Sequence, residues 1–287
     1  MSSEALEAIA ELERRVLEAD GGRLKLEWRS LRSRSGDRVE DVLWWEDDRL
    51  LGFLGLYGFG STPELAGMVS PDARGRGIGG ALLDDALELC RERGDQRPLL
   101  IVPRPSLAGK RLALRRGAVL DHSEHSLVLS GEPTKSSQEQ AIALRRATMA
   151  DLSLVSRLLE LGFGEPPHAD LAESLDSPHE RTAIVELHGS AVGTLRITWD
   201  GSDASIYGFV ISPDRQGRGL GRAALRQACD QLRAEGADRI RLEADVDNDR
   251  ALTLYTSIGF KPIITEDYYA LSTATVSANA ASVASGS

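Results

Sequence analysis

The sequence predicts an α/β protein made of two domains with the same fold. The chain has 287 residues, 41% of them hydrophobic, which is enough for two ordinary cores. Apolar runs of strand length alternate with amphipathic helical segments along most of it. A Ser-Pro-Asp turn followed by a glycine-rich stretch occurs at Ser70 and again at Ser212, and the same 142-residue spacing separates Gly117 from Gly259. A repeat of this length indicates a tandem duplication.

Composition and charge exclude several classes of protein. The formal net charge of -10 argues against a general nucleic-acid or anionic-membrane binder and favours a cationic or amine-bearing substrate. We find no apolar run of membrane length and no signal segment, so we expect a cytoplasmic protein, either a monomer or a homodimer. Cys90 and Cys229 lie among apolar neighbours in predicted helices, which favours reduced core thiols. The five histidines show no ligand spacing, so we expect no metal site.

The first half begins directly with a helix. Leu6, Ile9, Leu12 and Val16 repeat at helical spacing, so residues 4–19 are predicted to form an amphipathic helix. The elements expected after it are strands at 24–32, 38–45, 50–57 and 65–70, a helix at 78–92, a strand at 98–102, a helix at 106–116 and a hairpin at 118–129.

A polar stretch rich in helix breakers, residues 130–137, marks a linker. We therefore predict domains at 1–130 and 140–271, a linker at 131–139 and a disordered tail at 272–287. The elements expected in the second domain are a strand at 142–145, a helix at 149–161, a loop at 162–168 before a short helix, strands at 181–187, 191–199 and 206–211, a helix from 220, a strand at 239–244, a helix after Asn248 and strands near 260–271.

The most informative stretch joins the strand at 206–211 to the helix that begins at Leu220. The first amides of a helix have no internal partners and lie at the positive end of its dipole, so a turn without side-chain bulk at this point can bind phosphates. Gly217, Gly219 and Gly221 keep the turn open. Walker A and Rossmann loops do not fit, because no Gly-Lys-Ser/Thr follows and Arg222 stands where a third glycine would be needed.

Two segments resemble motifs of the GNAT N-acetyltransferases. Gln216-x-x-Gly219-x-Gly221 resembles their pyrophosphate-binding signature, and Asn248 to Phe260 resembles their later motif Asn-x-x-Ala-x-x-Leu-Tyr-x-x-x-Gly-Phe at every fixed position. The chain is thus similar to a tandem GNAT protein. The resemblance implies two domains, each a mixed, mostly antiparallel sheet flanked by helices with a splayed central strand pair. It also implies acetyl-CoA as co-substrate and direct transfer of the acetyl group to an amine.

The resemblance assigns roles in the second domain. Tyr255 stands where the family places the acid that protonates the departing thiolate, although an inward aromatic on a helix is also explained by packing. A backbone amide near Val210 would hold the developing oxyanion. Asn248 would contact the cofactor arm or only cap its helix. The remaining residues expected around acetyl-CoA are Ile211, Gln216, Gly217, Arg218, Gly219, Leu220, Gly221 and Arg222.

The general base is not identified by the resemblance. Related enzymes often carry a carboxylate on the strand before the glycine turn, but Ser205 begins the matching segment here. Glu243, Glu165 and Asp203 are the remaining candidates, with Glu243 preferred, and a chain of water molecules would also serve.

The first half retains the phosphate loop and loses other features. Arg74, Gly75, Gly77 and Gly79 match the cofactor loop, but Ser106 and Ala113 stand where the second half has Asn248 and Tyr255. We therefore expect a copy without the capping group or the acid, which either binds CoA without turnover or serves as a scaffold.

The acceptor is predicted to be the primary amine of a small molecule. A degenerate copy followed by an intact one also resembles the mycothiol synthase family, whose acceptor is a cysteinyl glucosaminyl inositol. Two further functions stay open at this point, namely acetylation of peptide or protein N-termini and CoA binding without turnover.

Overall fold

The two halves share one continuous sheet. The computed structural model describes residues 1–58, 62–95, 97–133, 141–164 and 171–273. Its eleven strands are hydrogen-bonded in the order β1-β2-β3-β4-β11-β5-β10-β9-β8-β7-β6. Among the described strands only the pairs β3/β4 and β9/β10 run parallel. The α/β class with a mixed, mostly antiparallel sheet flanked by helices is confirmed.

The elements of the first half follow the predicted order closely. They are α1 (Ser3–Asp20), α2 (Trp28–Ser33), β1 (Asp41–Glu46), β2 (Arg49–Tyr57), β3 (Glu64–Val69), α3 (Ile78–Arg93), β4 (Leu99–Pro103), α4 (Leu107–Arg115) and β5 (Val119–Leu129). One prediction is wrong: residues 24–27 have no regular structure and 28–33 form α2 instead of a strand. Apolar residues alternate at Leu24 and Leu26, as in a strand. From Trp28 to Leu31 the spacing is three residues, as in a helix, and Leu31 is fully buried in the core.

The second half repeats this arrangement with an added strand at its start. Its elements are β6 (Ile142–Arg146), α5 (Leu152–Phe163), α6 (Leu171–Asp176), β7 (Glu180–Leu187), β8 (Ser190–Asp200), β9 (Asp203–Ile211), α7 (Leu220–Ala234), β10 (Arg239–Asp245), α8 (Asp249–Ile258) and β11 (Phe260–Ala270). Residues 149–151 form a 3₁₀ turn, so the helix predicted from 149 starts at Leu152. Most of the predicted linker, part of the 162–168 loop and most of the tail lie outside the described residues.

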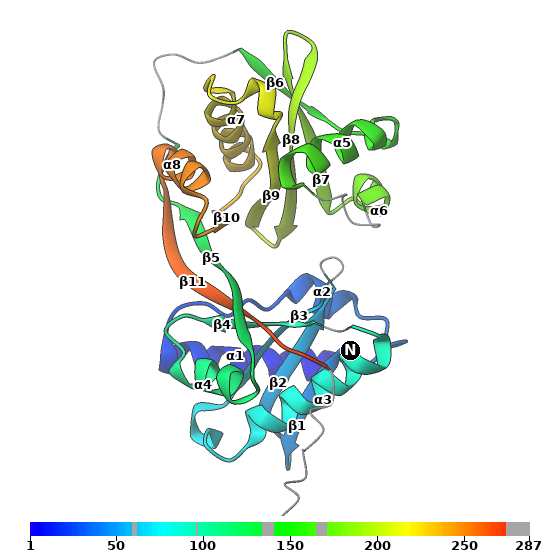
Figure 1. The fold of residues 1–287 in the computed structure, drawn as a ribbon, viewed down its shortest axis with the longest axis vertical. Helices are drawn as coiled ribbons and strands as arrows, with labels where there is room; N and C mark the ends of the chain where they lie inside the picture. The colour runs from blue at the N-terminus through cyan, green and yellow to red at the C-terminus, as the bar shows by residue number, and fades with distance from the viewer. Residues whose placement is uncertain (59–61, 96, 134–140, 165–170, 274–287) are drawn as a thin grey trace, which may run out of the picture.

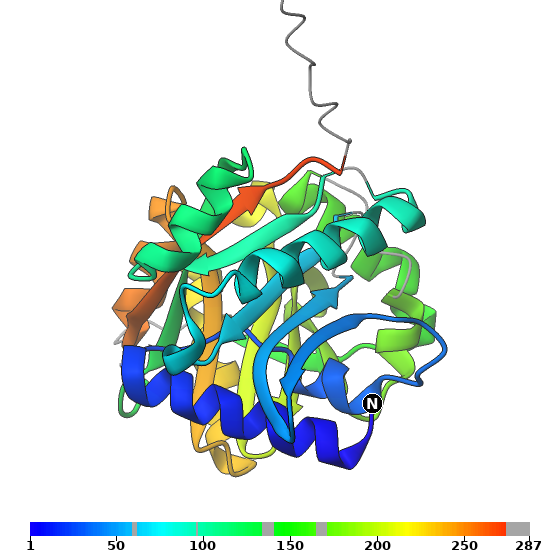
Figure 2. The ribbon, with the colours of Figure 1, turned by 90° about the horizontal axis from the view of Figure 1, so that it is seen from below.

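Helices cover both faces of each half of the sheet. In the first half, α1 packs on one face through Ile9, Leu12 and Val16, and α3 and α4 pack on the other. Figure 2 shows the strands of this half between α1 and α3. In the second half, α7 and α8 cover one face and α5 and α6 the other.

Cys90 and Cys229 are buried and unpaired, as predicted, and burial raises their thiol pKa values to about 11 and about 12.

The two halves exchange their last strands. The segment 118–129 is predicted to form a hairpin and 260–271 more than one strand, but each forms a single eleven-residue strand. β11 lies between β4 and β5, and β5 also pairs with β10. These long strands cross between the lobes in Figure 1. Alternating apolar and polar residues are compatible with a hairpin and with one long strand, and only the available partner edges decide between them.

A splay opens in the second half between two parallel strands. β9 and β10 are paired from Asp203 and Arg239 as far as Ile206 and Leu242, and the pairing ends there. The residues that follow on both strands, Tyr207 and Glu243 onward, line the same cavity.

No described helix is long and apolar enough to cross a membrane.

Candidate active site

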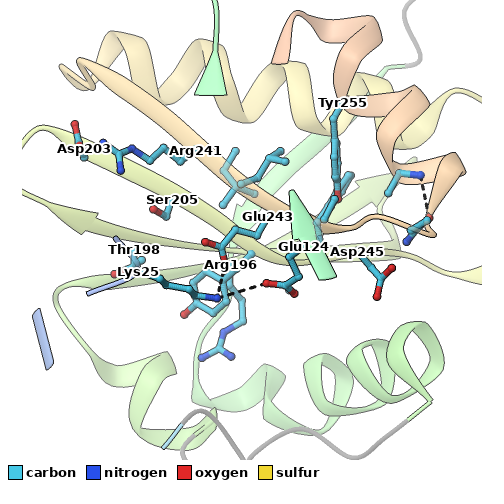
Figure 3. A pocket seen from close by; sticks show the side chains of 18 of the residues that line it. Lys25, Glu124, Arg196, Thr198, Asp203, Ser205, Arg241, Glu243, Asp245 and Tyr255 are labelled. Atoms are coloured by element: carbon cyan, nitrogen blue, oxygen red, sulfur yellow. Dashed lines mark hydrogen bonds and ion pairs between the residues drawn. The ribbon is translucent and has the colours of Figure 1, made fainter. Parts of the chain in front are cut away.

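A cavity of about 2110 Å³ lies between the two halves and receives residues from both. The second half contributes the ends of β9 and β10, the start of α7 and the inner side of α8. The first half contributes the segment 22–30 together with Glu64 and Glu124. Figure 3 shows side chains from both halves converging on this space.

The predicted phosphate-binding turn opens onto the cavity. Gly219 precedes the first residue of α7 and, like Gly217, has a left-handed backbone, with φ of 76° and 75°. A Cβ at either position would meet no atom within 4 Å, so the space in front of the turn is free. The Gln216 side-chain amide donates to the Ile211 carbonyl at 2.8 Å, which holds the turn against the end of β9. A loop of this shape at a helix start fits a diphosphate.

Most of the predicted cofactor residues are brought together here. The cavity is lined by Val210, Ile211, Gln216, Gly217, Gly219, Leu220, Gly221, Arg222 and Asn248. Arg218 does not line it and is directed to the Asp214 carbonyl. Arg250, which was not among the predicted residues, also lines the cavity.

A β-bulge interrupts β9 at the splay. Thr194 pairs with Val210 and Arg196 with Tyr207, so one residue of β8 faces the two residues Gly208 and Phe209. Gly208 has φ of 56°, which a residue with a side chain adopts only with strain. Bulges break the ladder and redirect backbone groups. In combination with the splay, this bulge leaves the stretch up to Val210 without a β10 partner on the cavity side.

Tyr255 lies on the inner side of α8 and lines the cavity. Its side chain is 9% exposed, the centroid of its ring lies 6.3 Å from that of the Phe260 ring, and we find no hydrogen-bond partner for its hydroxyl among the described residues. Burial raises the pKa of Tyr255 to about 12, so the phenol is protonated at neutral pH. Asn248 caps α8, as expected, by accepting from the Ala251 amide at 3.0 Å, and it lines the cavity as well.

Charged residues from both halves meet at the cavity wall. Lys25 is only 9% exposed and contacts Glu243 at 2.9 Å and Glu124 at 3.4 Å (Figure 3). Its Nζ also hydrogen-bonds Tyr268. Arg23 donates to Glu243 at 2.9 Å and to Ser126 at 2.6 Å. The residues that form this cluster (hereafter the Lys25 cluster) are Arg23, Lys25, Glu64, Glu124, Glu243 and Tyr268.

Glu243, the preferred base candidate, is held as a carboxylate by two cations. Burial alone would raise the pKa of Glu243, but the adjacent charges of Lys25 and Arg23 outweigh burial and bring it down to about 2. Arg23 contacts Oε1 and Lys25 contacts Oε2. A carboxylate stabilised in this way is a weak proton acceptor.

We expect Glu243→Gln to lower stability in a pH-dependent way. The pKa of about 2 in the folded protein is below the ordinary glutamate value, so the stabilisation is present above about pH 4.3 and is lost as the pH falls toward about 2. At pH 7 the variant should lose about 3 kcal/mol of unfolding free energy in urea titrations. The difference from the native protein should shrink between pH 5 and pH 3, and a difference that stays constant would contradict this assignment.

Asp203, the second base candidate, is not free at this site. Asp203 is bound by Arg239 and Arg241, each at 2.8 Å. Glu165 lies outside the described residues. Ser205 lines the cavity at the position where a carboxylate was sought, and it cannot accept a proton as a carboxylate does.

The first-half loop does not reach the cavity. None of Arg74, Gly75, Gly77 and Gly79 lines it. The Arg74 guanidinium donates to both carboxylate oxygens of Asp20, at 2.8 and 2.6 Å. Its Nε also donates to the carbonyl that ends β3, at 3.2 Å, which parallels the Gln216 contact in the second half.

The strand before this loop has no bulge. β2 and β3 pair in continuous register from Gly52 opposite Val69 to Tyr57 opposite Glu64. Ala113, at the position equivalent to Tyr255, is fully buried. One expectation is corrected: Ser106 does cap its helix, accepting from the Gly109 amide at 3.2 Å, because a serine hydroxyl replaces the asparagine oxygen in this role.

The cavity residues of the first half were not found from the sequence. Arg29 donates to Glu180 at 2.8 Å and to Thr198 at 3.0 Å, and Arg32 donates to Asp200 at 2.6 Å, so segment 22–33 is fixed against the second half. These residues form no motif, and their sequence separation of more than 140 residues leaves no local pattern to detect.

Known proteins resemble this chain over most of its length. The profile of the acetyltransferase (GNAT) family matches residues 5–117 and 152–260. A mycothiol acetyltransferase of Kytococcus sedentarius is 29% identical over 91% of this chain and 92% of its own length. A mycothiol acetyltransferase of Clavibacter michiganensis subsp. michiganensis is 28% identical over 70% of each chain.

Solved structures show the same fold. A GCN5-related N-acetyltransferase from Sphaerobacter thermophilus superimposes with a TM-score of 0.77 at 19% identity, covering 95% of this chain and 94% of its own. A tandem GNAT protein from the clavulanic acid biosynthesis pathway gives a TM-score of 0.63 at 19% identity, with 94% of each chain covered. From its two profile matches and its repeated architecture, this chain belongs to the acetyltransferase (GNAT) family and carries two copies of its fold.

Proposed function

We propose that the second half transfers an acetyl group from acetyl-CoA to the primary amine of a small molecule bound in the cavity between the halves. One observation supports this most strongly: the open glycine turn, the bulged strand and Tyr255 line a single cavity. Each of these features suits one part of an acyl transfer.

The residues of the chain divide this work. The co-substrate supplies an activated thioester. The amides of the first turn of α7 hold its diphosphate, and Arg222 and Arg250 add positive charge. The backbone at the bulge near Val210 donates to the oxyanion that develops on the acetyl carbonyl. Tyr255 gives its proton to the departing thiolate, whose ordinary pKa is roughly 8.5.

The acceptor lies on the other side of the splay, against the Lys25 cluster. Three carboxylates and two cations there favour a positively charged amine carried on a polar body. The named relatives that match most of the chain are mycothiol acetyltransferases, so a cysteinyl glucosaminyl inositol is our first candidate acceptor. The cavity of about 2110 Å³ has room for it beside the acetyl end of the co-substrate.

The first half is proposed to carry no acetyl-transfer site of its own. It lacks a phenol at Ala113 and a bulge in β3, and segment 22–33 completes the acceptor side of the cavity. Since one chain supplies every group named above, we propose that the active unit is a monomer or a homodimer with two separate sites, without a nucleic-acid or membrane partner.

We expect Tyr255→Phe to reduce acetyl transfer at least roughly tenfold, because positioned acid catalysis contributes ~10² or more. The measurement is thiol release from acetyl-CoA over a panel of amines that includes cysteine glycosides, amino sugars and a short peptide. Acetyl-CoA affinity should be nearly unchanged, since the substitution removes one hydroxyl and keeps the ring.

The panel also separates the candidate functions. Activity confined to the peptide would favour N-terminal acetylation. Binding of CoA without transfer to any amine would favour a non-catalytic module and refute the proposal. Equal turnover by Tyr255→Phe and native protein would remove Tyr255 as the acid.

A further inference from the structure

We infer that Glu124, supplied by the first half, accepts the proton of the attacking amine. This inference rests on the proposed function and adds a catalytic residue to it. It makes the active site a composite, with co-substrate and acid in the second half and the base on strand β5 of the first.

Among the residues that the structure describes, each second-half carboxylate that lines the cavity has a partner. Glu180 and Asp200 are paired with arginines of the first half, and Asp245 Oδ1 accepts from the Asp247 amide at 2.7 Å. Ser205 occupies the strand position at which a carboxylate was sought. Asp203 is paired with two arginines, and both oxygens of Glu243 are in contact with cations. A carboxylate oxygen in close contact with a cation is a weaker proton acceptor than one without such a contact.

Glu124 has one oxygen, Oε1, without a cation contact among the described residues. Its Oε2 accepts from the Tyr268 hydroxyl at 2.7 Å and is 3.4 Å from Lys25, whose closer contact, at 2.9 Å, is with Glu243. No partner of its Oε1 is found in the described part of the chain. The side chain is 25% exposed and lines the cavity, so an amine or a bridging water can reach this oxygen.

The strand exchange carries Glu124 to the splay. β5 pairs with β10 so that Glu124 lies directly opposite Asp245 and Ser126 lies opposite Glu243. Residues directly opposite each other in an antiparallel pair point to the same face of the sheet. Glu124 is therefore on the acceptor face of β10, where that strand has separated from β9, and Figure 3 shows it between Glu243 and Asp245.

Two other carboxylates of this region are less suitable. Glu64 lines the cavity, but its Oε2 is buried without a hydrogen-bond partner, and its strand pairs with β4 instead of β10. Glu266 is fully buried, does not line the cavity and faces Glu124 from β11. Burial raises the pKa of Glu266 to about 7.

The proposed step is balanced. The neutral amine nitrogen forms a bond to the acetyl carbon, and one N–H proton passes to Glu124 Oε1 directly or through one water. The carbon–sulfur bond breaks, and the sulfur takes the Tyr255 proton. Solvent then takes the proton of Glu124 and restores that of Tyr255. Tyr268 keeps Glu124 oriented by donating to its other oxygen.

The test is the pH dependence of kcat/KM in Glu124→Gln, measured on the full chain with the best amine of the panel. Glutamine retains the size of the side chain and an acceptor for Tyr268 but cannot take a proton. We expect a loss of about 10²-fold at pH 7. The loss should diminish as the pH rises, because more free amine and hydroxide replace the missing base. The titratable and charged groups facing Glu124 are Lys25, Glu64, Glu243, Asp245, Glu266 and Tyr268.

Glu64→Gln is the matched control, since it removes a second carboxylate near Lys25 from the same half. It should change the KM of the amine but keep kcat and the shape of the pH profile, because Glu64 belongs to the acceptor wall and takes no proton. Unchanged CoA affinity and melting temperature in Glu124→Gln would show that the fold is intact, and Glu124→Asp should recover part of the activity. If Glu124→Gln has native activity with an unaltered pH profile, Glu124 is not the base.

The outcomes for the two proposals differ. A native protein that acetylates no amine refutes the proposed function and the inference together. A native protein that is active and is matched by Glu124→Gln refutes the inference alone. An equal loss of kcat in Glu64→Gln and Glu124→Gln would also overturn it, because a general effect on the Lys25 cluster would then account for both.

Discussion

Gly219→Val should raise the KM for acetyl-CoA by about 10²-fold or more, the equivalent of losing about two hydrogen bonds to a charged group at 1.5–3 kcal/mol each. Gly219 has φ of 76°, and the space in front of it is free of protein atoms within 4 Å. A valine would therefore strain the turn and place its methyl groups where the diphosphate binds. Titration of CoA binding by calorimetry, together with steady-state kinetics, measures the effect.

Gly77→Val is the control for this variant. Gly77 is the equivalent residue of the first half, with φ of 87° and equally free space in front of it, so the backbone strain is comparable. Because the first-half loop does not line the cavity, acetyl transfer should be nearly unchanged. Equal losses in the two variants would mean that both loops serve one reaction.

Gly208→Val should lower kcat by 10²–10³-fold, the loss that follows removal of one donor to an oxyanion. The bulge requires φ of 56° at Gly208, and a Cβ there would lie 3.1 Å from the Arg196 side chain. A β-branched residue is therefore expected to remove the bulge and realign β9 with β8, which turns the amide near Val210 away from the acetyl carbonyl. Single-turnover kinetics at saturating acetyl-CoA isolate this effect on the chemical step.

The matched control is Gly201→Val, in the turn between β8 and β9. Gly201 has φ of 61°, and a Cβ at this position would meet no atom within 4 Å, so the variant carries similar backbone strain without touching the bulge. It should lose stability but retain kcat. A similar fall in kcat for Gly201→Val would show that the effect of Gly208→Val comes from general destabilisation of the strand.

The glycine turn and the Tyr255 helix could be predicted from the sequence because their chemistry is local. A helix start, its cap and the glycines before it lie within a few residues of one another, and their backbone requirements are readable from residue type. The repeat was also readable, since equivalent residues keep a constant spacing. The failures lie in pairing: residues 24–32 contain a helix, and the segments 118–129 and 260–271 each hold one long strand.

The sequence by itself determined the fold of each half, the glycine turn before α7, the position of Tyr255 and the loss of its equivalent at Ala113. Only the tertiary structure decided that β5 and β11 change places, that Lys25 and Arg23 form ion pairs with the Glu243 carboxylate, and that Glu124 lies at the splay. The physical reason is that strand pairing and the fields of buried charges depend on which surfaces meet in space. Lys25 and Glu243 lie in opposite halves of the chain and are joined by a 2.9 Å contact, and no pattern along the chain records it.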